Sequence, residues 1–224
     1  MGIIVKESGG KDIEPIPEGV YMAVCYGVID LGHQFSPAFN NENRKALIQW
    51  ELPDCRGDFE RDGQKMSLPR AISKRYTVSL SEKSNLRRDL ESWRGRRFTP
   101  VELSGFDLKA VLGASCQLQV VHDTTKEGRT VARVGAIMAL SKGMKPAKAE
   151  NPLAWFSFEE AGERPELPDG LPDWVCAIIK ESREWRTAYA ATPAPAATAT
   201  TSSSAPAPAP AAVDAVEDEE PLPF

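Results

Sequence analysis

Five carboxylates stand just before the end of the chain and are followed by Pro221-Leu222-Pro223-Phe224. The carboxylates are Asp214, Glu217, Asp218, Glu219 and Glu220. The two prolines keep the backbone extended, and Phe224 places an aromatic ring beside the C-terminal carboxylate. A peptide of this composition has too little apolar surface to fold on itself. We therefore expect it either to bind, as a ligand, a basic pocket on a partner protein that also accepts an aromatic ring, or to serve only as a solubilising segment.

A second set of residues suits the binding of a polyanion. Residues 61 to 97 carry eleven basic and four acidic side chains, although the whole chain has a net charge of −5. A single strand of nucleic acid is bound by a positive groove together with aromatic rings that stack on its bases. The candidates for these contacts are Trp50, Lys74, Arg75, Tyr76, Arg87, Arg88, Arg94, Arg96 and Arg97.

Several of these candidates also have a purely structural interpretation. Trp50 shares its predicted strand face with Ala46, Ile48 and Leu52, so burial in the core is an alternative to stacking on a base. The same alternative stands for Tyr76. The three arginines after Trp93 lie near a predicted helix C-terminus, where cations stabilise the helix dipole.

The chain offers little for catalysis. His33 and His122 are the only histidines, and neither accompanies a nucleophile motif or a phosphate-binding loop. The four cysteines are scattered without metal-ligand spacing. We expect a protein with no enzymatic activity, no metal and no cofactor. No apolar run approaches the ~20 residues of a membrane span, so we expect a cytoplasmic protein.

Strands dominate the elements that must position these side chains. The apolar run Val20–Leu31 predicts a strand with a bulge or a sharp bend at Gly27. Alternating patterns predict strands over Arg44–Leu52 and Ile72–Leu80, and a hairpin of Ser115–His122 with Thr130–Leu140.

Helices are expected between the third and fourth strands. Leu86, Leu90 and Trp93 form an apolar stripe on a helix over Glu82–Trp93, and Thr99-Pro100-Val101-Glu102 is a capping box that begins another. A third short helix is expected over Phe106–Leu112. Five strands with a helix between the third and fourth are typical of the OB fold, a small Greek-key barrel. We therefore predict a mainly β protein with an OB-like barrel, while other small barrels stay open.

Composition divides the chain into five parts. We expect an N-terminal lead (1–18), the barrel (19–145), an extension (146–189), an Ala/Pro/Thr/Ser-rich disordered linker (190–213) and the acidic tip (214–224). The extension should hold one helix from Pro172 to about Tyr189, with Trp174, Ile178 and Trp185 on one side. That side needs a partner, which is either the barrel or another subunit.

Two partial resemblances bear on function. The acidic Pro-Phe ending resembles the tips of bacterial single-stranded DNA-binding proteins, which recruit replication and repair enzymes. The stretch from Ile72 to Arg96, with Val28-Ile29-Asp30-Leu31-Gly32 and Gly105-Phe106-Asp107-Leu108, is similar to a segment of small phage-encoded replication proteins. That similarity covers roughly residues 19 to 145 and does not include the acidic ending. It implies a phage single-stranded DNA-binding protein or a close replication accessory.

These observations together predict a non-catalytic protein that binds single-stranded DNA without sequence preference in replication, recombination or repair. Its partners would be DNA and the replication or repair proteins that bind the tip; it could also form oligomers. Two alternatives remain: a protein–protein adaptor in replication, and a strand-annealing recombination protein that assembles into rings.

Overall fold

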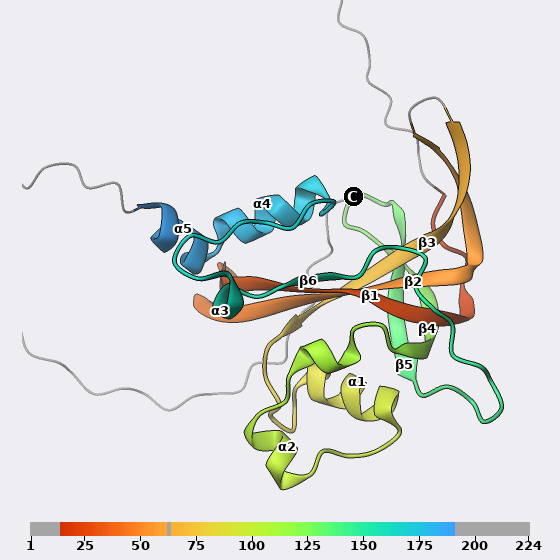
Figure 1. The fold of residues 1–224 in the computed structure, drawn as a ribbon, viewed down its shortest axis with the longest axis horizontal. Coiled ribbons are helices and arrows are strands. Elements are labelled where there is room, and N and C mark those ends of the chain that lie inside the picture. Colours follow the sequence, from red (N-terminus) through yellow and green to blue (C-terminus); the bar gives the residue numbers. More distant parts are fainter. Residues whose placement is uncertain (1–13, 62–63, 191–224) are drawn as a thin grey trace, which may run out of the picture.

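The computed structural model describes residues 14–61 and 64–190, which form a curled antiparallel sheet flanked by short helices (Figure 1). Its main strands are β1 (Gly19–Ser36), β2 (Asn41–Arg61), β3 (Gln64–Thr77), β4 (Ser115–Thr124) and β5 (Thr130–Met138). They pair in the order β3-β2-β1-β4-β5. Residues of β3 also approach β5, so the sheet curls into a half-barrel. The predicted mainly β class, with helices between the third and fourth strands, is confirmed.

Strand β1 holds the sheet together because it has neighbours on both edges. It pairs with β2 along residues 24–36, with β4 along residues 19–24, and with the short parallel strand β6 (Ala154–Phe156) along residues 27–29. The β1–β2 register shifts between Cys25 and Gly27, which confirms the predicted bulge. A Cβ atom at Gly27 would lie 2.4 Å from Oε1 and 3.2 Å from Cβ of Gln49, so a side chain here would require Gln49 to move.

The concave side of the sheet encloses the main core. Ile48, Trp50 and Leu52 alternate along β2 and point into it, as the sequence pattern predicts. Helix α1 (Asn85–Arg94) adds Leu86, Leu90 and Trp93 from the same stripe. It ends at Gly95, whose φ of 66° is the left-handed conformation that glycine adopts most easily.

Two short elements continue from α1 to β4. Helix α2 (Pro100–Ser104) begins with the predicted capping box, in which the Thr99 and Glu102 side chains each bind the other's backbone N–H. A 3₁₀ helix, η1 (Leu108–Val111), follows within the third predicted helical segment.

The convex side of β1 and β2 carries a second core. Ile29, Leu31 and Leu47 pack there against Phe156 and helix α4 (Asp173–Glu181), whose Val175 and Ile179 are fully buried. The apolar side of the extension therefore covers the protein's own sheet, one of the two partners left open by the sequence. Helices α4 and α5 lie on one side of the sheet, and α1 and α2 on the other (Figure 1). No helix in the described ranges has the length and apolar character needed to cross a membrane.

The single helix predicted from Pro172 to Tyr189 is wrong in one respect, because it breaks at Ser182. Helix α4 stops there and α5 (Arg183–Ala190) begins at the next residue. Ser182 has an extended backbone (ψ 154°), and its hydroxyl accepts a hydrogen bond from the Trp185 N–H at 3.2 Å. Serine caps helix starts in this way, so a buried Ser182 divides the helix.

Buried carboxylates tie the extension to the sheet. Asp30 binds the guanidinium of Arg44 at 2.6 Å and the backbone N–H of Phe158 at 3.3 Å. Glu51 is fully buried and accepts hydrogen bonds from the N–H of Glu150 (2.5 Å) and from the N–H (2.9 Å) and side-chain amide (2.6 Å) of Asn151. The chain between β5 and β6 is thus fixed by charged hydrogen bonds, which are stronger than neutral ones.

Candidate nucleic-acid interface

Trp50 and Tyr76, predicted to stack on bases, lie in the core. Trp50 is 0 % exposed, and its ring centre is 5.8 Å from that of Trp93. Tyr76 is 3 % exposed and donates a hydrogen bond to Oδ2 of Asp89 at 3.0 Å. The expectation that either ring faces a nucleic acid is therefore corrected. Both residues stand on the strand faces that point into the curl of the sheet, so the core alternative is the one the structure adopts.

Lys74 and Arg75 lie on opposite faces of β3. Lys74 is 9 % exposed, and its Nζ is 3.2 Å from the same carboxylate oxygen of Asp89 that Tyr76 binds. Lys74 therefore belongs to a buried polar network. The prediction that it is a surface cation available to DNA is wrong. Arg75 pairs across the sheet with Leu47 and is partly buried on the convex side.

Of the α1 arginines, Arg87 and Arg94 are engaged within the protein. Arg87 pairs with Glu91 one helical turn away at 3.2 Å. The guanidinium of Arg94 binds Glu102 and lies 4.5 Å from the ring centre of Phe98. This cation–π stacking holds the segment after α1 against the helix. A DNA phosphate would have to displace these contacts to reach either arginine.

Arg96, Arg88 and Arg97 are the accessible members of the predicted set. Arg88 and Arg96 have side chains 68 % and 55 % exposed, and Arg97 is also exposed. Arg96 binds Glu102 at 2.7 Å. Hydrogen bonds from Arg96, from the Thr99 N–H and from Arg94 hold the pKa of Glu102 far below its usual range.

The structure therefore does not bring the nine predicted residues onto one exposed surface. It joins Lys74 with Tyr76 through Asp89, and Arg94 with Arg96 through Glu102. The predicted partner-binding residues, Asp214 to Phe224, lie outside the described residues.

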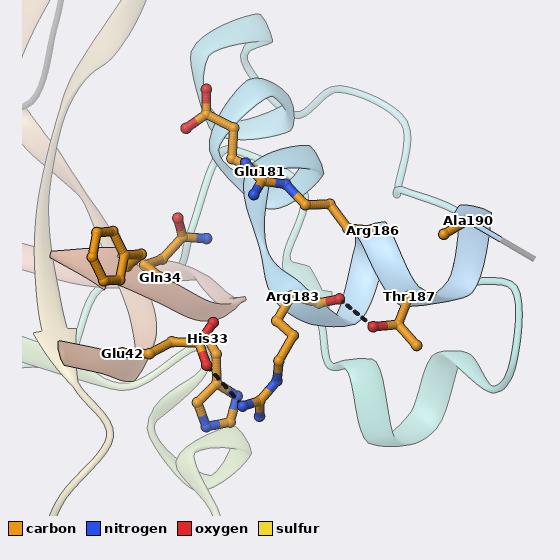
Figure 2. Close-up of a pocket in the computed structure, with 9 residues that line it drawn as sticks. His33, Gln34, Glu42, Glu181, Arg183, Arg186, Thr187 and Ala190 are labelled. Carbon is orange, nitrogen blue, oxygen red and sulfur yellow. Dashed lines mark hydrogen bonds and ion pairs between the residues drawn. The ribbon is translucent and has the colours of Figure 1, made fainter. Parts of the chain in front are cut away.

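Sequence reasoning missed a cleft at the end of the β1–β2 hairpin. It has a volume of about 460 Å³ and lies between the hairpin and α5 (Figure 2). The hairpin side is formed by His33, Gln34, Phe35 and Glu42, and the helical side by Glu181, Arg183, Arg186, Thr187 and Ala190. The four α5 residues follow the i, i+3, i+4, i+7 spacing of one helix face. This spacing could have predicted the shared helix face from the sequence, but only if α5 were already known to begin at Arg183.

Hydrogen bonds and ion pairs fix the walls of the cleft. Glu184 accepts a hydrogen bond from the backbone N–H of His33 at 2.7 Å and contacts its ring with the other carboxylate oxygen. Burial acts to raise the pKa of Glu184, but these bonds outweigh it and lower the pKa. Arg183 pairs with Glu42 at 2.7 Å, as Figure 2 shows. The amide of Gln34 donates to the carbonyls of Leu31 (2.6 Å) and Ile178 (3.0 Å).

The hairpin also exposes two aromatic rings. Phe35 is 61 % and Phe39 is 41 % exposed, and Phe35 lines the cleft. Arg186, on the opposite wall, makes no side-chain ion pair within residues 14–61 and 64–190. An exposed ring opposite an available guanidinium can hold a flat, negatively charged ligand. Residues 14–61 and 64–190 contain no cluster of three or more metal-ligating side chains.

Comparison with models of known protein families and with curated protein sequences gives no match.

Proposed function

We propose that this protein binds single-stranded DNA without sequence preference, in replication, recombination or repair, and recruits partner proteins through its acidic tip. The strand order β3-β2-β1-β4-β5, with α1 between β3 and β4, supports an OB-like barrel. OB folds bind oligonucleotides with the face of their second and third strands and with the loops after the first and fourth strands. The proposal also draws on the resemblance of the tip to those of bacterial single-stranded DNA-binding proteins.

One observation carries the DNA-binding part of the proposal: the β1–β2 hairpin exposes Phe35 at the end of β1 and Phe39 in its loop, and Phe35 lines a cleft together with Arg183 and Arg186. Exposed aromatic rings beside cations are the elements with which proteins bind single strands. The convex face of β1 and the facing part of β2 are covered by α4 through Leu31 and its neighbours. Because the extension covers this face, we expect DNA to bind at the β1–β2 hairpin instead.

Titration of a fluorescently labelled oligo-dT at two salt concentrations tests the proposal. We expect binding that weakens with salt, with a log–log slope of about 0.7 for each phosphate contact. Absence of binding at low salt would refute DNA binding and favour the adaptor alternative.

The accessible arginines in α1 and directly after it form a second arm of this test. Replacing Arg88, Arg96 and Arg97 together with Ala should flatten the salt slope if the strand also follows α1, because these side chains are exposed. Arg94→Ala is the control for structural damage, since Arg94 is stacked on Phe98. An unchanged slope in the triple variant would remove this side of the molecule from the interface.

Recruitment by the tip needs its own experiment. The experiment compares pull-downs from a bacterial lysate with the full chain and with a chain that lacks Phe224. Both chains have the same five carboxylates, but only the full chain has the terminal ring. We expect replication or repair proteins only with the full chain. Equal recovery of partner proteins by both chains would mean that the tip only keeps the protein soluble.

A further inference from the structure

The cleft between the β1–β2 hairpin and α5 has two walls of different chemistry. The hairpin wall presents the ring of Phe35, which is 61 % exposed. This exposure is unfavourable, because transfer of a phenylalanine ring out of water lowers the free energy. The helical wall presents the guanidinium groups of Arg183 and Arg186 together with the carboxylate of Glu181 (Figure 2). A nucleotide has the matching pair of groups: a flat base with an apolar face, and an anionic phosphate.

The two arginines are not equivalent. Arg183 is held by Glu42 at 2.7 Å and also lies 3.7 Å from Glu184. Arg186 has no such pair among the described residues. An incoming phosphate can bind Arg186 directly, whereas it must compete with Glu42 for Arg183.

The cleft is also formed in advance of any ligand. Gln34 is tied to two carbonyl groups, and Glu184 binds both the backbone and the ring of His33. These contacts join β1 to α4 and α5, so a ligand need not order the walls when it binds. Its volume of about 460 Å³ falls in the range of about 300–1,000 Å³ of small-ligand pockets, which is enough for one nucleotide.

We propose that this cleft is a single-nucleotide subsite on the path of the bound strand, in which Phe35 stacks on a base and Arg186 binds the neighbouring phosphate. The inference rests on the proposed function. It assigns the C-terminal extension a direct role in binding, because α5 supplies the phosphate contact. Glu42 then limits affinity, since it neutralises the second arginine.

Four variants test the subsite in oligo-dT titrations at two salt concentrations. Phe35→Ala should weaken binding about 5- to 150-fold, the range for loss of one stacked base. Arg186→Ala should make the salt slope shallower by about 0.7. Glu42→Gln should make it steeper by about 0.7, because Arg183 loses its 2.7 Å ion pair and keeps only the 3.7 Å contact with Glu184. The double variant Glu42→Gln/Arg183→Ala should not show this steeper salt slope.

Matched controls are exposed charged residues outside the cleft lining. Lys142→Ala removes an exposed cation after β5, and Glu82→Gln removes an exposed carboxylate before α1. Both should bind like the unaltered protein. Urea unfolding of each variant confirms that it is folded, and ultraviolet cross-linking of the oligo-dT complex should recover a peptide that contains Phe35.

The outcomes separate this inference from the proposed function. If the unaltered protein binds oligo-dT but Phe35→Ala and Arg186→Ala bind as tightly as the controls, the subsite is refuted and DNA binding stands. If the unaltered protein does not bind, both fail. A Glu42→Gln variant that binds more weakly than the Glu82→Gln control would overturn the role given to Glu42.

Discussion

Glu51 offers a sharp test of how the extension is held on the sheet. Its carboxylate is fully buried and accepts three hydrogen bonds, one from the Glu150 N–H and two from Asn151. Replacing it with Gln keeps the shape but changes one acceptor oxygen into a donor NH₂ group. The amide oxygen can take the place of Oε2 and keep both bonds to Asn151, while the bond to Glu150 is lost.

The magnitude follows from the number of donors left without an acceptor. One unsatisfied buried donor costs about 1–3 kcal/mol. Glu51→Gln leaves the N–H of Glu150 without its acceptor, so we expect it to lower the free energy of unfolding by about 1–3 kcal/mol. Glu51→Ala loses all three bonds and leaves a cavity, and we expect about 2–4 kcal/mol.

Urea unfolding measures the free energies, and amide hydrogen exchange locates the effect. The amides of Glu150 and Asn151 should lose protection in Glu51→Ala, whereas those in α1 should change only with global stability. Glu159→Ala is the control: its ion pair with Arg44 is 76 % exposed on the glutamate side, so its loss should cost less than about 1 kcal/mol. A Glu51→Ala variant within about 0.5 kcal/mol of the unaltered protein would refute this reasoning.

Three further predictions concern the core, the bulge and the acid limb of stability. Trp50→Ala should lower the free energy of unfolding by about 3–5 kcal/mol but leave the DNA affinity of the folded fraction unchanged; weaker binding by folded protein would restore Trp50 to the interface. Gly27→Ala should cost about 1–3 kcal/mol through steric overlap, measured against Gly105→Ala, where a Cβ meets nothing within 4 Å. The folded-state pKa of Glu102 is depressed, so its contribution to stability is present above the ordinary value of 4.5 and is lost as pH falls toward the folded-state pKa. Melting temperatures of Glu102→Gln should therefore fall less steeply below pH 4.5 than those of the unaltered protein, and parallel acid limbs would contradict the assignment.

Local patterns were enough to predict most of the elements. The strand over Val20–Leu31, its bulge at Gly27 and the capping box at Thr99 are all confirmed, because each depends on neighbours within a few residues. Patterns of this kind failed where the deciding contact was distant. Strand β6 is three residues long, and only the free edge of β1 beyond its pairing with β4 makes it a strand.

The candidate site was harder to predict than the fold. Alternation along β2 and β3 establishes which residues share a face, but it does not say which face the protein buries. Both faces of β2 are covered here, by α1 on one side and α4 on the other, so Trp50 became core and Leu47 did as well. An arginine-rich segment likewise shows its charge in the sequence, while the pairing of Arg94 with Glu102 appears only when α2 folds back on α1.

By itself, the sequence determined the β-rich domain, the helices that follow β3, the uneven distribution of charge and the acidic Pro-Phe ending. These depend on residue type and short-range spacing. Only the tertiary structure decided which aromatic rings reach the surface and which cations are already paired. It alone joined the hairpin at Phe35 to the helix at Arg186, some 150 residues further along the chain. The physical reason is that burial and ion pairing depend on contacts between distant segments, and no local pattern records which segments will meet.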